Sequence, residues 1–493
     1  MKLVRLRIKE FKNLRDCEIE FTQPFLLNAV IGRNGSGKSN LIEAILHILI
    51  GVYFKKSPPF DFRFEFEAQE RKLILEGKDR RLSVRVDGES KSVKYFAERL
   101  RDGSGQVYYP ELTLVYYSGA CQRVLRLLKR YEREFQRLTR KPETDRYRPL
   151  FVETSNEQSD VILLALFAHR QLIFLRHLGL TGVANVSLEL RSPQGFDPKK
   201  HEPKLWNTEG AVRRIVAAID ETASSQQSRR ENKVEREDSS EEEVAYSETR
   251  TYQFGDGIHA EHSITDLADR LSRSGDNLYL ALEHLRIRGI FRSVSFQLKG
   301  PTGDDFFEFD QLSEGEKQLV AVIGAFYLIN RPDNLVLLDE PDTHLNPQWS
   351  WEYSAMLSEA FNEQQRRRST VLMATHNPVM ISGLMRNQVL LAHPSSNGAS
   401  TFTRPVRNPR GQGVANLLCS QEFFGLPSSL DKETQKLLDE RLEISIKQDL
   451  TDAERMRLKE LNEQLEITMA PGISERDPEY VKYLRERHGS NQG

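Results

Sequence analysis

The spacing of apolar positions changes several times along the chain, and each change predicts a different element. Residues 2–9 and 16–31 have the pattern of short β-strands, and a helix is predicted from about Lys38 to Leu49 after a glycine-rich turn. From Phe62 to Val93 the period is two, with Asp87-Gly88 as a hairpin-turn pair. These patterns predict an antiparallel sheet that packs beside a parallel one.

The middle of the chain has a different pattern. An apolar strand is predicted over 112–117, a long arginine-rich helix begins near Gln122, and 158–178 has the apolarity of a buried helix. Residues 222–251 are rich in Ser, Gln, Glu and Arg and have too few apolar side chains to bury a core, which predicts a flexible acidic and polar segment. We therefore expect 121–290 to be a mostly helical insertion.

Strand–helix alternation resumes near Ser293 and continues to about Leu391, and 430–466 is predicted to form two amphipathic helices. A capping box over residues 451–454 opens the second of these helices. The expected organisation is one domain in two parts, with a helical insertion between them and a C-terminal helical region that is a candidate for partner docking. The predicted ranges are 1–120, 121–290, 291–395 and 396–493.

Composition excludes several classes of protein. The chain has 493 residues, and its 70 Lys and Arg nearly balance 72 Asp and Glu, so a uniformly basic nucleic-acid coat is excluded. The three cysteines lie far apart, which excludes a disulfide framework and a CxxC zinc site. Apolar runs are far shorter than the ~20 residues of a membrane helix, and no apolar signal-peptide core opens the sequence. We expect a cytoplasmic protein with no membrane segment.

A phosphate-binding loop is the strongest motif. Residues 32–39, Gly-Arg-Asn-Gly-Ser-Gly-Lys-Ser, match GxxxxGK[ST] between a predicted strand and a predicted helix. Glycines let backbone N–H groups turn toward phosphate oxygens at a helix N-terminus. We expect Lys38 to contact the β- and γ-phosphates of ATP and Ser39 to bind Mg²⁺. The cofactor-binding candidates in this segment are Asn34, Gly35, Ser36, Gly37, Lys38, Ser39 and Asn40.

A second motif supplies carboxylates. Four apolar residues, 335–338, predict a buried parallel strand that ends in Asp339 and Glu340. Ligands of parallel sheets bind at the carboxyl ends of the strands. Asp339 is therefore predicted to hold Mg²⁺ in the Walker B position, and Glu340 to act as the general base that activates water.

Two further segments narrow the class of phosphate-binding-loop proteins to which the chain could belong. Leu-Ser-Glu-Gly-Glu at 312–316 precedes an apolar-spaced helix with Ser313 as a suitable N-cap, 24 residues before Asp339 and so about a helix plus a loop away. Downstream, a strand over 370–374 ends in Thr-His-Asn at 375–377, which brings His376 to where a γ-phosphate contact is needed.

In their order and spacing these motifs resemble those of the ABC-type ATPases, in the branch with SMC-like, RecF-like and OLD-like proteins, over roughly 1–120 and 290–395. The resemblance implies an α/β ABC-type ATPase head in which a mixed, largely parallel core sheet packs beside an antiparallel subdomain. It also implies that two chains sandwich two ATP molecules. Ser313 and Gly315 would close over the γ-phosphate of a partner subunit, residues 342–345 would form the D-loop, and His376 would be the catalytic switch histidine. Gln122 matches the Q-loop glutamine, a Mg²⁺ ligand in this family, although a plain surface glutamine is an equal alternative.

Departures from the transporter pattern narrow the resemblance further. The signature is LSEGE where transporters have LSGGQ, and residues 339–347 resemble the DEPxxHLxP of OLD-like ATPases. The Toprim nuclease pattern of OLD proteins is missing after His376. The layout is most similar to the ATPase components of Septu-type and retron-associated anti-phage systems, which implies an effector nuclease of the HNH type as a separate protein.

The basic helix over 122–141 has two interpretations. Arginines and lysines far outnumber its two glutamates, Glu132 and Glu134. A solvated helix face is the first interpretation. A surface that binds the phosphates of DNA or RNA is the second, and such binding would weaken steeply with added salt.

The function predicted from sequence is an ATPase that requires ATP and Mg²⁺. It forms a homodimer, or a higher even-numbered oligomer, around ATP and regulates an effector nuclease by an order–disorder switch at the γ-phosphate. Two alternatives remain: a RecF/SMC-like DNA-repair ATPase that binds DNA directly, and a nucleotide-gated scaffold with little turnover.

Overall fold

A computed structural model describes residues 1–21, 26–102, 108–118, 122–139, 149–193, 196, 204–235, 243–255, 257–301, 306–329, 332–394, 398–447 and 449–468. These residues form two compact units. The first comprises Met1–Met380 and Asn387–Thr403, and the second comprises Ile381–Arg386 and the chain from Arg404 onward. In the described part of the chain, no helix combines the length and apolarity needed to cross a membrane.

A seven-stranded sheet forms the centre of the first unit, in the order β18-β17-β3-β16-β15-β8-β9. All neighbours from β17 to β9 pair in parallel, and β18 is antiparallel to β17. The three central strands are buried along their whole length, which requires the near-continuous apolar runs seen in the sequence. The strands are β3 (Leu27–Ile31), β8 (Thr113–Tyr117), β9 (Phe151–Thr154), β15 (Leu335–Asp339), β16 (Thr370–Thr375), β17 (Val389–Pro394) and β18 (Ser400–Thr403).

A six-stranded antiparallel sheet packs beside this core, in the order β2-β1-β4-β5-β6-β7. Its strands alternate buried and exposed positions, as the period of two predicts, and Asp87 and Gly88 adopt the positive φ angles of a tight hairpin turn. The strands are β1 (Lys2–Phe11), β2 (Leu14–Glu20), β4 (Phe62–Ala68), β5 (Arg71–Lys78), β6 (Arg81–Val86) and β7 (Glu89–Lys91). Helix α1 (Lys38–Phe54) is buried within the shared core, and α2 (Val93–Asp102) packs on it. The predicted α/β class with parallel and antiparallel sheets is confirmed.

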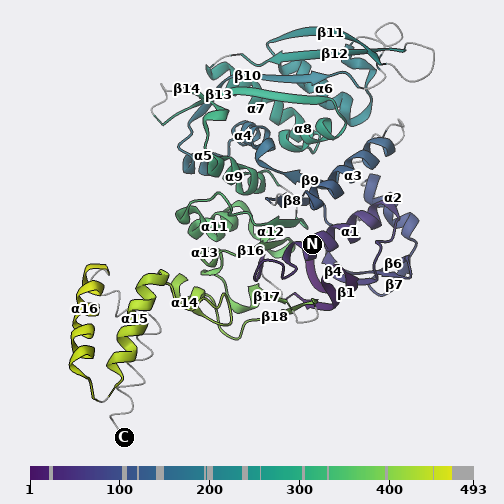
Figure 1. Ribbon diagram of the computed structural model, residues 1–493. Coiled ribbons are helices and arrows are strands. Elements are labelled where there is room, and N and C mark those ends of the chain that lie inside the picture. The colour runs from purple at the N-terminus through teal and green to yellow at the C-terminus, as the bar shows by residue number, and fades with distance from the viewer. Residues whose placement is uncertain are drawn as a thin grey trace. The chain divides into compact units, whose positions relative to one another are not determined.

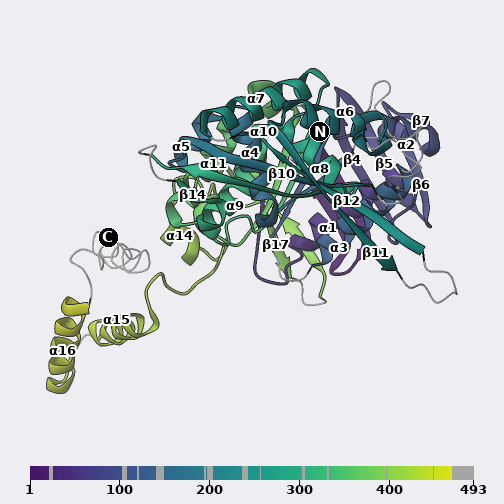
Figure 2. The same cartoon turned by 90° about the horizontal axis from the view of Figure 1, so that it is seen from above.

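A third, five-stranded antiparallel sheet, in the order β11-β12-β10-β13-β14, lies beside the helices of the predicted insertion (Figures 1 and 2). The insertion does contain α3 (Arg123–Leu138), α4 (Ser159–Ala168), α5 (Leu172–His177), α6 (Gly210–Thr222), α7 (Gly257–Arg273) and α8 (Leu278–Ile287). These helices accompany β10 (Gly182–Arg191), β11 (Ser225–Glu235), β12 (Glu243–Gln253), β13 (Phe291–Lys299) and β14 (Phe306–Glu308). Residues 225–235 and 243–251, predicted to be flexible, belong to β11 and β12, which pair with one another, and β12 also pairs with β10. Strand pairing thus orders a polar segment that has too few apolar residues to form a core of its own.

The rest of the first unit follows the predicted alternation. Helix α9 (Glu314–Leu319) continues through a π-helical turn (Val320–Gly324) into α10 (Ala325–Leu328), and β15 follows. After β15 come α11 (Pro347–Ala360) and α12 (Glu363–Arg368), and a short α13 (Pro378–Ile381) follows β16.

The second unit contains the two predicted C-terminal helices. Helices α15 (Lys432–Ser445) and α16 (Asp452–Thr468) lie side by side, and α14 (Val414–Cys419) precedes them (Figures 1 and 2). The Arg457 guanidinium on α16 donates to both carboxylate oxygens of Glu440 on α15, at 2.7 and 2.9 Å. The predicted capping box is present, because Thr451 and Glu454 each accept a hydrogen bond from the other's backbone N–H.

Candidate nucleotide site

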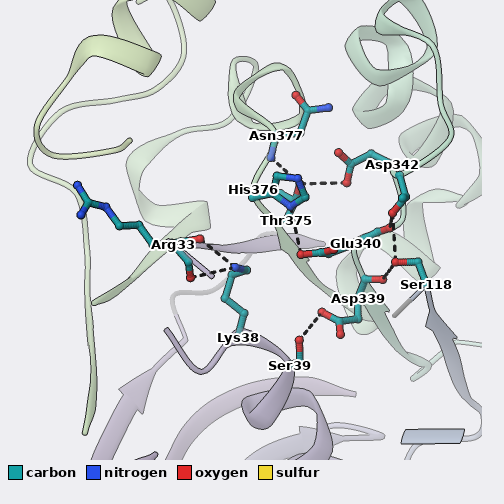
Figure 3. A network of polar contacts seen from close by, with 12 residues as sticks. Arg33, Lys38, Ser39, Ser118, Asp339, Glu340, Asp342, Thr375, His376 and Asn377 are labelled. Carbon is teal, nitrogen blue, oxygen red and sulfur yellow. Dashed lines mark hydrogen bonds and ion pairs between the residues drawn. The ribbon is translucent and has the colours of Figure 1, made fainter. Parts of the chain in front are cut away.

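The carboxyl ends of β3, β15 and β16 bring the predicted phosphate and carboxylate motifs together (Figure 3). The phosphate-binding loop leaves β3 and enters α1 at Lys38. Gly35 and Gly37 have φ angles of 82° and 96°, which side chains rarely adopt. A β-carbon on Gly37 would also lie 2.6 Å from the Ser400 Oγ atom, so glycine is required there by both conformation and space.

The Lys38 side chain lies against the backbone of the loop. Its Nζ atom donates hydrogen bonds to the carbonyl oxygens of Gly32 at 2.9 Å and Arg33 at 3.4 Å (Figure 3). Burial lowers the pKa of Lys38, while the negative charges of Glu340 and Asp339 oppose that shift. The result is a largely desolvated cation at the mouth of the loop, an environment in which an incoming phosphate is attracted strongly.

Ser39 and Asp339 face each other across the site. The Ser39 Oγ atom donates to the Asp339 Oδ1 atom at 3.1 Å (Figure 3). Burial raises the pKa of Asp339 to about 6, against the lowering effects of the Ser39 hydrogen bond and the charges of Lys38 and Arg123. A hydroxyl and a buried carboxylate are the oxygen ligands that Mg²⁺ prefers, and a divalent cation would supply the countercharge that this carboxylate lacks. The pair therefore fits a magnesium ion.

Glu340 and His376 form the second polar pair. The His376 Nδ1 atom lies 3.1 Å from the Glu340 Oε1 atom, and both side chains are partly exposed to solvent. Glu340 has a φ angle of 51°, unusual for a side chain of this size, and its backbone N–H donates to the carbonyl oxygen of Ala374 at 2.8 Å. This hydrogen bond ties the end of β15 to the end of β16, so the carboxylate and the imidazole are held by neighbouring strands.

The predicted D-loop, residues 342–345, is held by hydrogen bonds from side chains to which the sequence assigned no role. The Thr375 hydroxyl donates to the Asp342 Oδ1 atom at 3.0 Å. The Ser118 hydroxyl donates to the carbonyl oxygen of Asp339 at 3.1 Å and accepts from Thr343 at 3.2 Å (Figure 3). Ser118 follows β8, the neighbour of β15, so the strand order would have indicated it.

Asn13 is a further missed residue. It follows β1, and its Nδ2 atom donates to the carbonyl oxygen of Gly35 at 2.9 Å. Asn40, predicted to bind cofactor, donates to the Asn13 Oδ1 atom at 2.6 Å. Asn34 is exposed, and the hydroxyl of Ser36 is buried without a hydrogen-bond partner among the described residues.

The signature residues contact the D-loop. Ser313 caps α9, and its hydroxyl and backbone N–H donate to the Glu316 carboxylate at 2.7 and 2.8 Å. A β-carbon on Gly315 would lie 2.8 Å from the carbonyl oxygen of His344. The Gln318 side chain donates to the carbonyl oxygen of Pro341 and accepts from the backbone N–H of His344, both at 2.8 Å. The Gln318 hydrogen bonds therefore hold helix α9 against residues 341–344.

Gln122, the candidate Q-loop glutamine, is exposed at the N-cap of α3 and makes no side-chain capping bond. Its neighbour Arg123 contacts the first turn of α1, because the Arg123 Nη1 atom donates to the Asn40 Oδ1 atom at 3.2 Å. Arg123 begins the helix, which turns the residue toward α1.

Comparison with known proteins supports the class that the motifs indicate. The family model described as "AAA domain" matches residues 5–249, which include the predicted phosphate-binding loop. The model described as "AAA domain, putative AbiEii toxin, Type IV TA system" matches residues 192–382, which include the predicted signature, Asp339 and His376. Together with the motifs, these matches support an ABC-class AAA ATPase.

Among curated proteins, the chain is similar to the Septu protein PtuA of Bacillus mycoides, with 24% identity over 186 residues, which are 36% of this chain and 25% of PtuA. It is 34% identical over 104 residues to the DNA replication and repair protein RecF of Magnetococcus marinus, which covers 19% of this chain and 27% of RecF. The chain thus spans about a quarter of the length of these relatives. A solved Smc head bound to the C-winged helix domain of ScpA aligns over 82% of this chain and 98% of its own, at 14% identity and a TM-score of 0.37.

Proposed function

We propose that the chain binds ATP with Mg²⁺ at the phosphate-binding loop and hydrolyses it. The observation that carries this proposal is the convergence of Lys38, the Ser39–Asp339 pair and the Glu340–His376 pair at adjacent strand ends. Lys38 and the loop N–H groups would bind the phosphates, and Ser39 and Asp339 would hold the ion. Bound Mg²⁺ would neutralise charge on the phosphate oxygens.

Glu340 would accept the proton of the attacking water. Its carboxylate is partly exposed and hydrogen-bonded to His376, which can orient it and contact the γ-phosphate. Because the His376 ring has two nitrogens, one can face Glu340 while the other faces the phosphate. Hydrolysis would thus depend on the coupled ends of β15 and β16.

Dimerisation around ATP is the second part of the proposal. The contacts of Ser313 and Gly315 lie within α9 and with the D-loop, and α9 is anchored by Gln318. A second chain in head-to-tail orientation would bring its own Ser313 hydroxyl to the γ-phosphate, as the ABC-type resemblance implies. ATP would then join two chains, and cleavage of the γ-phosphate would release them.

The proposed output is control of a separate effector nuclease of the HNH type in anti-phage defence. The similarity to the Septu protein PtuA supports this assignment. The second unit is the proposed docking region, because α16 and the end of α15 expose Met456 at 69% and Ile446 at 58%.

Affinity purification from native cells, followed by mass spectrometry, tests this proposal. Tagged Glu340→Gln protein is expected to hold ATP, and tagged Lys38→Ala protein is expected to be empty. We expect an endonuclease to be recovered with one of these two baits and to be several-fold weaker with the other. Equal recovery with both baits, or recovery of replication and repair proteins only, would contradict nucleotide-gated control of a nuclease.

Direct nucleic-acid binding is a second candidate function, and α3 favours it. Arg126, Arg130 and Arg133 are exposed at helical spacing on one face. Glu132 pairs with Arg286 of α8 at 2.7 Å, and Glu134 pairs with Lys56 at 3.0 Å and with Arg130 of α3 itself at 3.5 Å. Cations outnumber carboxylates on this helix, which makes the face a cationic stripe on a nearly neutral chain.

Charge reversal tests this second function. Changing Arg126, Arg130 and Arg133 to Glu is expected to remove duplex-DNA binding at low salt and, where residual binding is measurable, to reduce the log–log salt slope by about three. Fluorescence anisotropy over a salt series measures both quantities. Lys94→Glu/Arg99→Glu on the exposed face of α2 is the control, and DNA binding that survives the α3 changes would exclude this surface.

A further inference from the structure

Helix α3 begins beside the phosphate-binding loop and packs along α1. Its buried side chains, Val124, Leu127, Leu128, Tyr131 and Phe135, recur at helical spacing. The rings of Tyr131 on α3 and Tyr53 on α1 meet edge to face, with centroids 5.5 Å apart. This packing holds the first residue of α3, Arg123, against the first turn of α1.

Three hydrogen bonds connect Arg123 to the loop through two side chains, and all three run in the same direction. The Arg123 guanidinium donates to the Asn40 Oδ1 atom at 3.2 Å, and the Asn40 amide donates to the Asn13 Oδ1 atom at 2.6 Å. The Asn13 amide then donates to the carbonyl oxygen of Gly35 at 2.9 Å. In a side-chain amide the oxygen accepts hydrogen bonds and the nitrogen donates them. A bond to the oxygen therefore fixes the direction in which the nitrogen donates to the next residue.

The relay ends on the peptide between Gly35 and Ser36. Gly35 has a φ angle of 82°, and a β-carbon built on it would meet no atom within 4 Å, so side-chain packing does not hold this residue. The Ser36 N–H of the same peptide donates to the carbonyl oxygen of Arg33 at 3.1 Å, and the Asn13 amide holds the Gly35 carbonyl on the other side. Because a peptide unit is planar, fixing the Gly35 carbonyl also fixes the direction of the Ser36 N–H. That N–H belongs to the loop proposed to bind phosphate.

We propose that Arg123 is a positioning residue for ATP binding, which it promotes through Asn40 and Asn13 by fixing the Gly35–Ser36 peptide. The role rests on the proposed ATP site. Farther along α3, Glu132 pairs with Arg286 of α8 at 2.7 Å, and the side chain of Gln136 donates to the carbonyl oxygen of Ile287. The relay therefore links ATP affinity to the position of α3 and of the insertion that α3 contacts.

Charge offers a competing explanation. The positive charge of Arg123 also lowers the pKa of Asp339, against the effect of burial. A purely electrostatic role would act through Asp339 and would be independent of Asn13. The two roles can be separated because Asn13 is neutral and contacts the loop rather than the carboxylate.

A double-mutant cycle on the full chain tests the relay, with a fluorescent ATP analogue in the presence of Mg²⁺ as the probe. We expect Arg123→Ala and Asn13→Ala each to weaken analogue binding by about 5-fold or more, the usual range of coupling between sites. Because both act through the same contact, the double variant should bind no more weakly than Asn13→Ala alone. Arg123→Lys, which keeps a donor, should recover part of the loss.

Arg99→Ala on α2, the other helix packed on α1, is the matched control. The Arg99→Ala variant should bind the ATP analogue with wild-type affinity. Combined with Asn13→Ala, it should bind as weakly as Asn13→Ala alone. Melting temperatures measured without nucleotide identify any variant that is merely unfolded. If the affinity loss of the Arg123→Ala/Asn13→Ala double variant equals the product of the two single losses, the relay is overturned, while the proposed ATP site stands. A wild-type chain that binds no analogue would overturn both.

Discussion

Replacing Glu340 by glutamine is expected to remove nearly all ATP turnover while leaving ATP binding intact. The amide keeps the shape of the side chain and can still hydrogen-bond His376, 3.1 Å from the carboxylate in the structure, but it cannot accept the proton of the attacking water. The loss of a general base typically costs about 100-fold or more in rate. ATP should therefore remain bound between two chains.

Two measurements check this expectation. Phosphate release gives the rate, and analytical ultracentrifugation with ATP gives the fraction of dimer, which should be larger and longer-lived than for the wild type. Glu359→Gln, an exposed carboxylate on α11, is the control and should leave both unchanged. A Glu340→Gln chain that hydrolyses ATP as fast as the wild type would show that another group is the base.

Lys38→Ala is expected to have the second large effect, a loss of ATP binding itself. Its ammonium is nearly desolvated over the loop, with the Asp339 and Glu340 carboxylates nearby. Removing it deletes a charge-assisted bond to phosphate worth roughly 1.5–3 kcal/mol, or about 10- to 100-fold in affinity. It also removes one of the two positive charges, those of Lys38 and Arg123, that act on the buried Asp339 carboxylate, which opposes binding of the anionic nucleotide.

Isothermal titration calorimetry with ATP and Mg²⁺ measures this loss. Lys56→Ala is the control, because Lys56 lies just beyond α1 and pairs with the surface residue Glu134. Undiminished affinity in the Lys38→Ala chain would mean that the loop is not the phosphate site.

The sequence predicts the centre of this site because each motif there is a short continuous segment. The loop over 32–39 and the carboxylates at 339 and 340 each follow an apolar strand, and the ends of parallel strands meet at one edge. The pairing of Ser39 with Asp339 is therefore a direct consequence of the strand order.

The site residues that the sequence does not reveal are far in sequence from the residues that they contact. Asn13, Ser118 and Arg123 belong to no motif and reach the site only because β1, β8 and α3 pack beside α1 and β15. The same limit applies to residues 225–235 and 243–251, where the sequence predicts no strands. Their polar composition indicates flexibility, but pairing of β12 with β10 supplies order that hydropathy does not encode.

Mixing two inactive chains tests the central claim, that each ATP pocket is shared between two copies. Lys38→Ala removes the loop half of a pocket, and Ser313→Arg places a large cation where the signature hydroxyl would meet the γ-phosphate. In a mixed dimer, one pocket combines both intact halves and the other combines both defects. An equimolar mixture should therefore recover about a quarter of the wild-type ATPase rate, because half of the dimers are mixed and each has one working pocket. A mixture as inactive as either variant alone, or a Ser313→Arg chain that is fully active as a monomer, would contradict the shared pocket.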